Sequence, residues 1–398
     1  MNKKAIAILG AIFLLIVGTL GFLLYTKYKS NNNTTTPPGP IVDKNQSSTT
    51  PDNTGDGGNN PATTTPANNS SSPFVKLSGD QVISPAIFYN GNGVTYFDTS
   101  GTLYQADFNS SGGQLQLTNK RQLSVEARPN LSKILWPNKG DDFIAEFTNS
   151  KGNISFSYYN SGTRSYVDLP SQVTSLDWMP NGDKIIFIWT DQGKSTINMA
   201  SPDTSNYQTI ADMWQTDNEI HVSPDGTNIL YFETASSAAD NKITLTTPDG
   251  KVWKDLVKDG YNYGVLWSPD GQKFLFAKKD RLSGKYQLWY YGLTSGEVKN
   301  LGLFTTVDKV VWGPDSSTVY AAVPSGGGSS SGSLTNDSFF KIDTSTLSKQ
   351  EYKPDSGQSI DGESLFLSNN GDKLFFKNAQ DGGLYYLDLT QPSTGIGS

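Results

Sequence analysis

The chain has 398 residues, of which 35% are hydrophobic and 12% aromatic, and its 31 basic and 38 acidic side chains give a formal charge of -7. These charges are scattered rather than gathered in a basic block, so we expect no nucleic-acid partner. The chain has no cysteine and a single histidine. This composition excludes disulfides, thiolate metal sites and a cysteine nucleophile, and we expect no cofactor and no metal.

The first segment of the chain is an uncharged run, AIAILGAIFLLIVGTLGFLLY, from Ala5 to Tyr25. At about 1.5 Å per helical residue it spans roughly 30 Å, the thickness of a bilayer core. Residues 1–29 are therefore predicted to form one transmembrane anchor. A cleaved signal peptide is the alternative, although no small-residue cleavage site follows the run.

Residues 30–73 consist almost entirely of Asn, Thr, Pro, Ser and Gly. Such a segment has too few apolar side chains to offset the entropy of ordering, so it is predicted to be a disordered linker. Lysines flank the apolar run on both sides and leave its orientation open. Uncharged Thr/Pro/Ser stalks are typical of the outer side of a membrane. We therefore expect a cytoplasmic N-terminus, with the rest of the chain extracytoplasmic, at the cell surface or in the periplasm.

A short motif recurs seven times in residues 74–391, in the order apolar strand, tight turn, apolar strand. The turn positions of the copies are Gly91, Gly140, Gly182, Gly226, Gly271, Ser316 and Gly371. Each copy reads as four short strands bounded by turn residues. This period predicts an all-β chain that forms a seven-bladed β-propeller of four-stranded antiparallel blades.

The copy "VLWSPDGQKFLFA" at residues 265–277 shows the logic of the motif. Proline and aspartate favour the turn, and glycine accepts the left-handed conformation that ends it. The second strand is apolar because its neighbours cover both of its faces. Tryptophans at positions 136, 178, 267 and 312 precede the turn by four residues and are predicted to fill the wedge between adjacent blades.

The last copy lacks a fourth strand, whereas the segment from Phe74 to Leu77 has the pattern of one unassigned strand. We predict that this segment completes the last blade and closes the ring, which removes an exposed sheet edge. Residues 392–398 remain as a C-terminal tail.

The residues WSPDG followed by an apolar strand resemble the TolB-type repeat, a relative of WD-repeat propellers. The resemblance covers Phe74 to Gln391 and implies the propeller fold. It does not assign a function, because propellers support binding, scaffolding and many chemistries. An anchor and a linker stand where TolB has a small folded domain, so we do not expect TolB's partners.

Few residues suggest catalysis. His221 has no second histidine or cysteine with which to bind a metal, and is expected to be structural. Asp225, Asp270 and Asp315 recur at one turn position, so a turn-forming role explains them. The segment GSSSG at residues 328–332 lies in a Gly/Ser loop between strands, which is the wrong context for a nucleophile elbow. We therefore predict that the chain is not an enzyme.

The longer loops, between the second and third strands and between successive blades, are predicted to share one face of the disc. Loops on a rigid scaffold often carry recognition. Trp214, Tyr261 and Tyr263 are the first candidates to bind a partner, because loop aromatics can anchor a peptide or stack on a sugar. Arg121 and Arg281 are further candidates. Each of the three rings could instead simply pack its own loop.

These features together predict a membrane-tethered propeller that binds a protein or peptide of the cell envelope. Carbohydrate recognition, based on the same aromatics, is the alternative. A propeller glycoside hydrolase is a weaker alternative, because it needs a carboxylate pair that the sequence does not identify.

Overall fold

The computed structural model describes residues 72–391 except 89–90, 112–113, 124–125, 214–217, 235–239 and 326–332. The predicted anchor, almost all of the predicted linker and the tail lie outside the described residues. Within the described part of the chain, no helix is long and apolar enough to cross a membrane.

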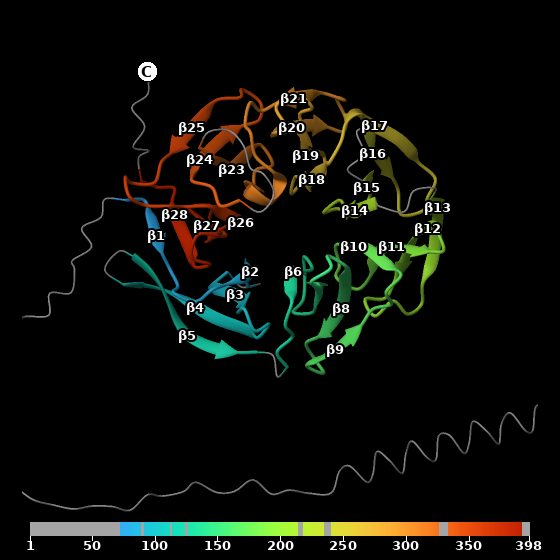
Figure 1. The fold of residues 1–398 in the computed structure, drawn as a ribbon, viewed down its shortest axis with the longest axis horizontal. Helices are drawn as coiled ribbons and strands as arrows, with labels where there is room; N and C mark the ends of the chain where they lie inside the picture. The colour runs from blue at the N-terminus through green and yellow to red at the C-terminus, as the bar shows by residue number, and fades with distance from the viewer. Residues whose placement is uncertain are drawn as a thin grey trace, which may run out of the picture. The chain divides into compact units, whose positions relative to one another are not determined.

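The described chain folds into seven antiparallel sheets of four strands each, which surround a common axis (Figure 1). The predicted seven-bladed β-propeller is confirmed. Blade 1 comprises β2 (Ile83–Ile87), β3 (Gly93–Phe97), β4 (Leu103–Ser111) and β5 (Gln114–Gln122). Blade 2 comprises β6 (Leu131–Leu135), β7 (Phe143–Thr148), β8 (Ile154–Asn160) and β9 (Ser165–Asp168). Blade 3 comprises β10 (Val173–Trp178), β11 (Ile185–Asp191), β12 (Lys194–Ala200) and β13 (Gln208–Met213).

The next blades repeat this order. Blade 4 comprises β14 (Asn218–Val222), β15 (Ile229–Glu233), β16 (Asn241–Thr246) and β17 (Trp253–Gly260). Blade 5 comprises β18 (Gly264–Trp267), β19 (Lys273–Lys279), β20 (Tyr286–Gly292) and β21 (Val298–Asn300). A short 3-10 helix, η1 (Val307–Lys309), precedes blade 6, which comprises β22 (Val310–Trp312), β23 (Thr318–Pro324), β24 (Asp337–Asp343) and β25 (Lys349–Tyr352).

Blade 7 closes the ring. It combines β26 (Gly362–Leu367), β27 (Lys373–Asn378) and β28 (Leu384–Asp388) with β1 (Phe74–Lys76) from the start of the described chain. Strand β1 pairs antiparallel with β28, so that Phe74 lies opposite Leu387 and Val75 opposite Tyr386. The predicted role of this segment is confirmed, and blade 7 gains the strand that its own repeat lacks.

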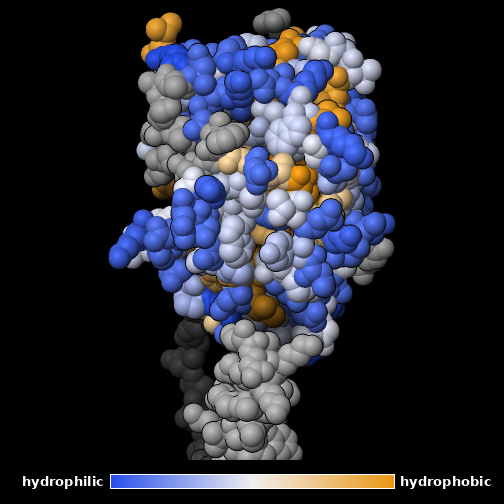
Figure 2. Space-filling model, turned by 90° about the vertical axis from the view of Figure 1, so that its right-hand side faces the viewer, coloured by the Kyte–Doolittle hydropathy of each residue, from blue (hydrophilic) through white to orange (hydrophobic). Residues whose placement is uncertain are grey.

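The second strand of each blade forms the core. In β19, Phe274, Leu275 and Phe276 have no exposed surface, and Ala277 is 2% exposed. The strand is covered on both faces because blades pack on either side of it. Burying each large apolar side chain contributes roughly 1.5–3 kcal/mol. The outer rim is different: Figure 2 shows a mainly hydrophilic surface with scattered hydrophobic side chains.

The turn aspartates have the predicted structural role. The Asp270 Oδ1 atom accepts hydrogen bonds from Ser268 Oγ at 2.6 Å and from the Gln272 N–H at 3.0 Å. Gly271 closes the turn with a φ of 66°. Burial opposes ionisation of Asp270, but hydrogen bonds, with that from Ser268 first, outweigh it and lower the pKa of the carboxyl.

Candidate functional site

Tryptophan side chains join neighbouring blades at three seams. The indole Nε1 of Trp178 in blade 3 donates a hydrogen bond to the Leu135 carbonyl of blade 2 at 2.9 Å. Trp267 in blade 5 donates to the His221 carbonyl of blade 4 at 3.2 Å, and Trp312 in blade 6 to the Leu266 carbonyl of blade 5, also at 3.2 Å. In each case the acceptor belongs to the innermost strand of the preceding blade. The predicted wedge role is confirmed, and the N–H group adds a specific bond to it.

Trp136 in blade 2 occupies the same repeat position but breaks this pattern. Its Nε1 atom is buried and has no hydrogen-bond partner among the described residues. The equivalent acceptor would be the carbonyl of Ala86 in β2, which lies at a register shift between Ile83 and Ala86. Such irregularities re-aim the residues beside them. The Ala86 carbonyl accepts a hydrogen bond from Thr95 Oγ1 at 3.3 Å instead.

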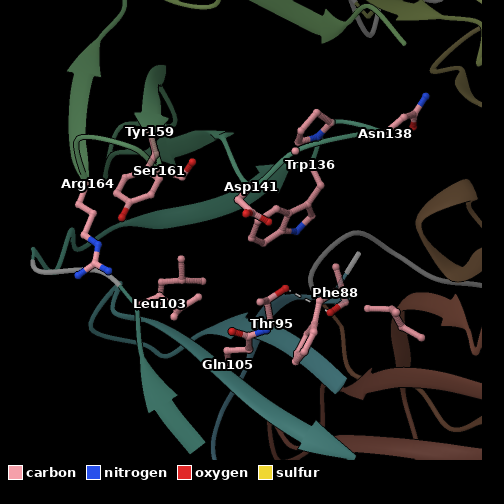
Figure 3. A pocket seen from close by; sticks show the side chains of 15 residues that line it. Phe88, Thr95, Leu103, Gln105, Trp136, Asn138, Asp141, Tyr159, Ser161 and Arg164 are labelled. Atoms are coloured by element: carbon pink, nitrogen blue, oxygen red, sulfur yellow. Dashed lines mark hydrogen bonds between the residues drawn. The ribbon is translucent and has the colours of Figure 1, made fainter. Parts of the chain in front are cut away.

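A cavity of about 420 Å³ lies at this seam, between blades 1 and 2. Figure 3 shows side chains from both blades around it, with the Trp136 indole between Asp141 and the blade 1 residues. Aromatic rings from both blades contribute to its lining, namely Phe88, Trp136 and Tyr159. A cavity of this volume is large enough to hold a small ligand or part of a peptide.

Several polar groups in the lining are available to a ligand. Arg164 lies in the turn before β9, is exposed, and makes no hydrogen bond or ion pair with a described residue. Asp141 is also exposed, and no described residue bonds to its carboxylate. Gln105 Oε1 accepts a hydrogen bond from Arg121 Nη2 at 2.8 Å, so its amide nitrogen remains a donor. The cavity therefore offers donors on two sides and one carboxylate.

The blade 2 wall of the cavity is held by Asp142. Its Oδ1 atom accepts hydrogen bonds from the Ser161 N–H at 2.8 Å and from Ser161 Oγ at 2.7 Å, and Tyr158 donates to its other oxygen. Burial disfavours the Asp142 carboxylate, but the bonds from Ser161 and then Tyr158 outweigh it and lower its pKa. A charged, fully bonded carboxylate thus fixes the backbone that carries Ser161 into the cavity lining.

The residues singled out from the sequence are dispersed around the ring. Arg121 is half exposed on β5 and touches the cavity lining through Gln105. Arg281 lies at the β19–β20 loop, pairs with Asp240, and stacks its guanidinium over the Tyr261 ring with its centre 5.0 Å from the ring centroid. Trp214 lies outside the described residues.

Tyr263 is a core residue rather than a surface one. It is 6% exposed and packs between Phe232 of blade 4 and Phe276 of blade 5. Burial raises the pKa of its hydroxyl well above the usual range. Its ring therefore stabilises the seam between blades 4 and 5. Among the candidates that the structure describes, Tyr261 and Arg281 are in direct contact.

A second cavity, of about 440 Å³, lies against blades 2, 3 and 4, shares Trp136 with the first cavity, and includes His221, Glu219 and Asp177. Asp177 has a structural role there, because its oxygens accept the backbone N–H groups of Trp178 and Val222, each at 2.8 Å. Burial lowers the pKa of His221 to about 4, so the ring is neutral at pH 7. No group of three or more His, Cys, Asp or Glu side chains in the described part of the chain could hold a metal ion.

A scan against protein-family models and a search of curated proteins found no match. Among solved structures, an oligogalacturonate lyase from Vibrio parahaemolyticus is 11% identical, with a TM-score of 0.54 over 79% of this chain and 93% of the lyase chain. The β-propeller domain of Cps50 (Swd1) from Myceliophteria thermophila is 9% identical, with a TM-score of 0.53 over 79% of this chain and 99% of that domain. TolB from Acinetobacter baumannii is 16% identical over 81% of each chain, with a TM-score of 0.43. At these identities the likeness shows the fold alone, and at that level the resemblance of the repeat is confirmed.

The prediction that the chain is not an enzyme is corrected by this comparison. A propeller of closely similar extent is an oligogalacturonate lyase, so this fold does not exclude catalysis. The sequence argument failed because it searched for catalytic residues at fixed spacing. A propeller builds its sites from loops of separate blades, whose spacing in the sequence carries no signature. The likeness assigns no reaction to this chain.

The cavity between blades 1 and 2 was not anticipated from the sequence. Trp136 was identified only as one of four equivalent wedge residues, and Asp141, Gln105 and Arg164 carried no signal of their own. The sequence offers no hint of this seam, because the first repeat (IFYNG) lacks the tryptophan just as the fourth (VSPDG) and the seventh (LSNNG) do.

Proposed function

We propose that the chain is a membrane-tethered, extracytoplasmic propeller that binds an extended segment of a protein or peptide of the cell envelope in the cavity between blades 1 and 2. The observation that carries this proposal is the indole N–H of Trp136. It lacks the acceptor that the equivalent indoles of blades 3, 5 and 6 have.

Internal symmetry identifies the missing group. At each of the three complete seams the indole donates to a main-chain carbonyl oxygen. The Trp136 Nε1 atom is buried, so the ring must shift for its N–H to reach a ligand in the cavity. A carbonyl of a bound peptide then presents the same chemistry, and satisfying the donor contributes about 1 kcal/mol or more. Asp141 can accept a peptide N–H, while Gln105 and Arg164 can donate to further carbonyls or to a carboxylate. A peptide backbone, with alternating donors and acceptors, matches this set.

The tethering part of the proposal is supported by the uncharged run from Ala5 to Tyr25 and by the polar linker of residues 30–73. On sealed cells, an external protease is expected to remove the propeller and leave a membrane-bound fragment. Full protection of the propeller in sealed cells, or its recovery without detergent in the soluble fraction, would contradict the tether and its orientation.

The binding part is tested with an array of short peptides with blocked ends, probed with the full-length protein in detergent. Trp136→Phe keeps an aromatic ring but removes the N–H, so the affinity of bound peptides is expected to fall about fivefold, the equivalent of one hydrogen bond. Trp253→Phe is the matched control. Its indole lies on the outer strand of blade 4 and donates to the Gly250 carbonyl, so binding should be unchanged.

Two outcomes would overturn the proposal. One is the absence of any peptide bound by the folded protein, or an equal affinity of the wild type and Trp136→Phe. The other is selective binding of an oligosaccharide on a glycan array in place of peptides, which would assign the cavity to carbohydrate.

A further inference from the structure

A lysine is buried where blades 6 and 7 meet. Lys309 ends helix η1, and its side chain is only 5% exposed. Two aspartates face it: Asp337, at the start of β24, has a fully buried side chain, and the Asp361 side chain, just before β26, is 4% exposed. These three side chains come from three segments of the chain and belong to neither cavity described above.

The contacts within this cluster are direct. Lys309 Nζ donates to Asp337 Oδ2 at 2.8 Å, to Thr335 Oγ1 at 3.2 Å, and to Asp361 Oδ1. The other oxygen of Asp361, Oδ2, accepts the backbone N–H of Thr335 at 2.8 Å. Asp337 is held by Thr335 Oγ1 at 2.7 Å and by the Gly362 N–H at 2.9 Å. Amine, carboxyl and a second carboxyl are therefore fixed against one another.

As an ion cluster this arrangement is costly. It places one positive and two negative charges in a site with almost no access to water, and removing such groups from water is strongly unfavourable. Burial raises the pKa of Asp337, even though Lys309 opposes the shift, so this carboxyl is suited to hold a proton. Burial lowers the pKa of Lys309, but Asp337 and then Asp361 outweigh it and raise this pKa, so the amine rests as the ammonium and must pass its proton on before it can react. A reaction that removes the charges of Lys309 and Asp361 would eliminate much of this cost.

We propose that Lys309 and Asp361 condense to an intramolecular amide that joins blade 6 to blade 7. The Lys309 ammonium first gives a proton to Asp337, and the neutral amine forms a bond from Nζ to Cγ of Asp361. The C–Oδ1 bond of Asp361 then breaks, and Oδ1 leaves as water after taking one proton from Asp337 and one from the amine nitrogen. One ammonium and one carboxylate thus become one amide and one water, with no oxidant or other reactant.

Each neighbour has a definite part in this step. Asp337 carries the proton between the amine and the leaving oxygen. The Thr335 N–H binds Asp361 Oδ2, the atom that carries negative charge as the amine adds, in the manner of an oxyanion donor. Asn378 Oδ1 accepts the Asp361 backbone N–H at 2.9 Å and holds the residue in place. Because the two reacting groups are held side by side in one chain, the reaction is intramolecular. Well-oriented groups of this kind react as if each were present at about 10⁵–10⁸ M.

The amide would cross-link residues 52 positions apart, in a chain that has no cysteine. It would tie η1 to the residue before β26, the first strand of blade 7, which is the blade that β1 completes. Opening the ring between blades 6 and 7 would then require breaking a covalent bond.

Peptide mapping of the full-length protein tests this proposal. Trypsin cannot cleave after an acylated Lys309, so the expected product is residues 300–341 joined to residues 350–373, lighter by the mass of one water than the sum of the two peptides. Separate peptides that end at Lys309 would overturn the proposal. Because an Asp–Gly pair can itself lose water by forming a succinimide, loss of water from residues 350–373 without a joined peptide would also overturn it.

Variants provide a readout that an ordinary ion pair would not give. Asp361→Asn is expected to form the same link with loss of ammonia instead of water, whereas Lys309→Met cannot form it. Asp337→Asn is expected to leave most chains unlinked, because the proton carrier is gone. Lys278→Met is the control, since Lys278 is also largely buried, at 15% exposure, and is paired with Asp259, but lies outside this cluster. Its map should show the link at the wild-type level.

Discussion

The difference between Trp178 and Trp136 gives a direct energetic test of the seams. Both residues precede the turn of their repeat, but only the Trp178 indole bonds to the preceding blade. Trp178→Phe removes the donor and leaves the Leu135 carbonyl without it, which costs about 1–3 kcal/mol. The smaller ring adds about 1 kcal/mol for the space left in the core. The expected total is about 2–4 kcal/mol.

Trp136→Phe is expected to behave differently. Its N–H has no partner to lose, and removing an unsatisfied buried donor is favourable, which offsets the cost of the smaller ring. Because these two effects oppose each other, we expect the free energy of unfolding of Trp136→Phe to lie within about 1 kcal/mol of the wild-type value. The lost N–H would then weaken peptide binding without weakening the fold.

Urea unfolding followed by circular dichroism measures both variants in the full-length protein. A lower midpoint with an unchanged slope reports a loss of stability in the folded state. The reasoning is refuted if the two variants lose equal stability, because Trp136 would then make an indole bond equivalent to that of Trp178. The cavity would in that case be only a packing gap.

Two further predictions concern pH and ring closure. His221 has a pKa of about 4 in the fold, against 6.5 for the free side chain, so its contribution is complete above pH 6.5 and is lost as the pH falls toward 4. The loss of stability is about 3 kcal/mol at most, because the His221 side chain is 26% exposed and water screens part of the effect. His221→Gln should remove this slope, and stability curves that remain parallel between pH 6.5 and 4 would contradict it. The pKa values of Asp177 and Glu219 are raised, so these two residues add stability as the pH falls, in the wild type and in His221→Gln alike. The second prediction concerns ring closure. The Leu77 N–H donates to the Leu384 carbonyl, and because every second residue of an antiparallel strand bonds to its partner strand, the Val75 N–H also points toward β28, opposite Tyr386. Val75→Pro should therefore destabilise by about 3 kcal/mol, whereas Lys76→Pro, whose N–H points to the open edge, should cost clearly less in the same urea assay. Equal losses would show that β1 does not hold the ring closed.

The ring could be predicted because its information is repeated. Seven copies of one turn, each with an apolar second strand, identify the blade, and a missing last strand identifies the closing segment. A strand boundary that is wrongly assigned in one copy does not change the length of the repeat. The arrangement of the strands could therefore be predicted from the sequence alone.

The sites could not be predicted, because they depend on departures from the repeat in three dimensions. In sequence Trp136 is indistinguishable from Trp178, and the difference lies in the adjacent blade, where the Ala86 carbonyl stands beside a register shift and accepts a bond from Thr95 instead. Asp337 lies 28 residues after Lys309 in the sequence, and Asp361 lies 52 residues after it. The three side chains meet only because η1 and the starts of β24 and β26 lie side by side in the fold. Tyr263 was expected on a loop, but the chain enters the core immediately after Asn262.

Ring closure explains why the seam between blades 1 and 2 can lack its indole bond. In an open stack of repeats, stability is approximately the sum of interfaces between neighbours, and a weak interface lets one end separate. In this ring, separating blades 1 and 2 frees neither end, because β1 and β28 are paired on the other side of blade 1. The missing indole bond thus lowers stability locally without opening the fold. A covalent link between blades 6 and 7 would reinforce this protection at the seam preceding the closing blade. A closed ring can accordingly keep a cavity between two blades. In an open array of the same blades, the blades on either side of such a cavity would separate.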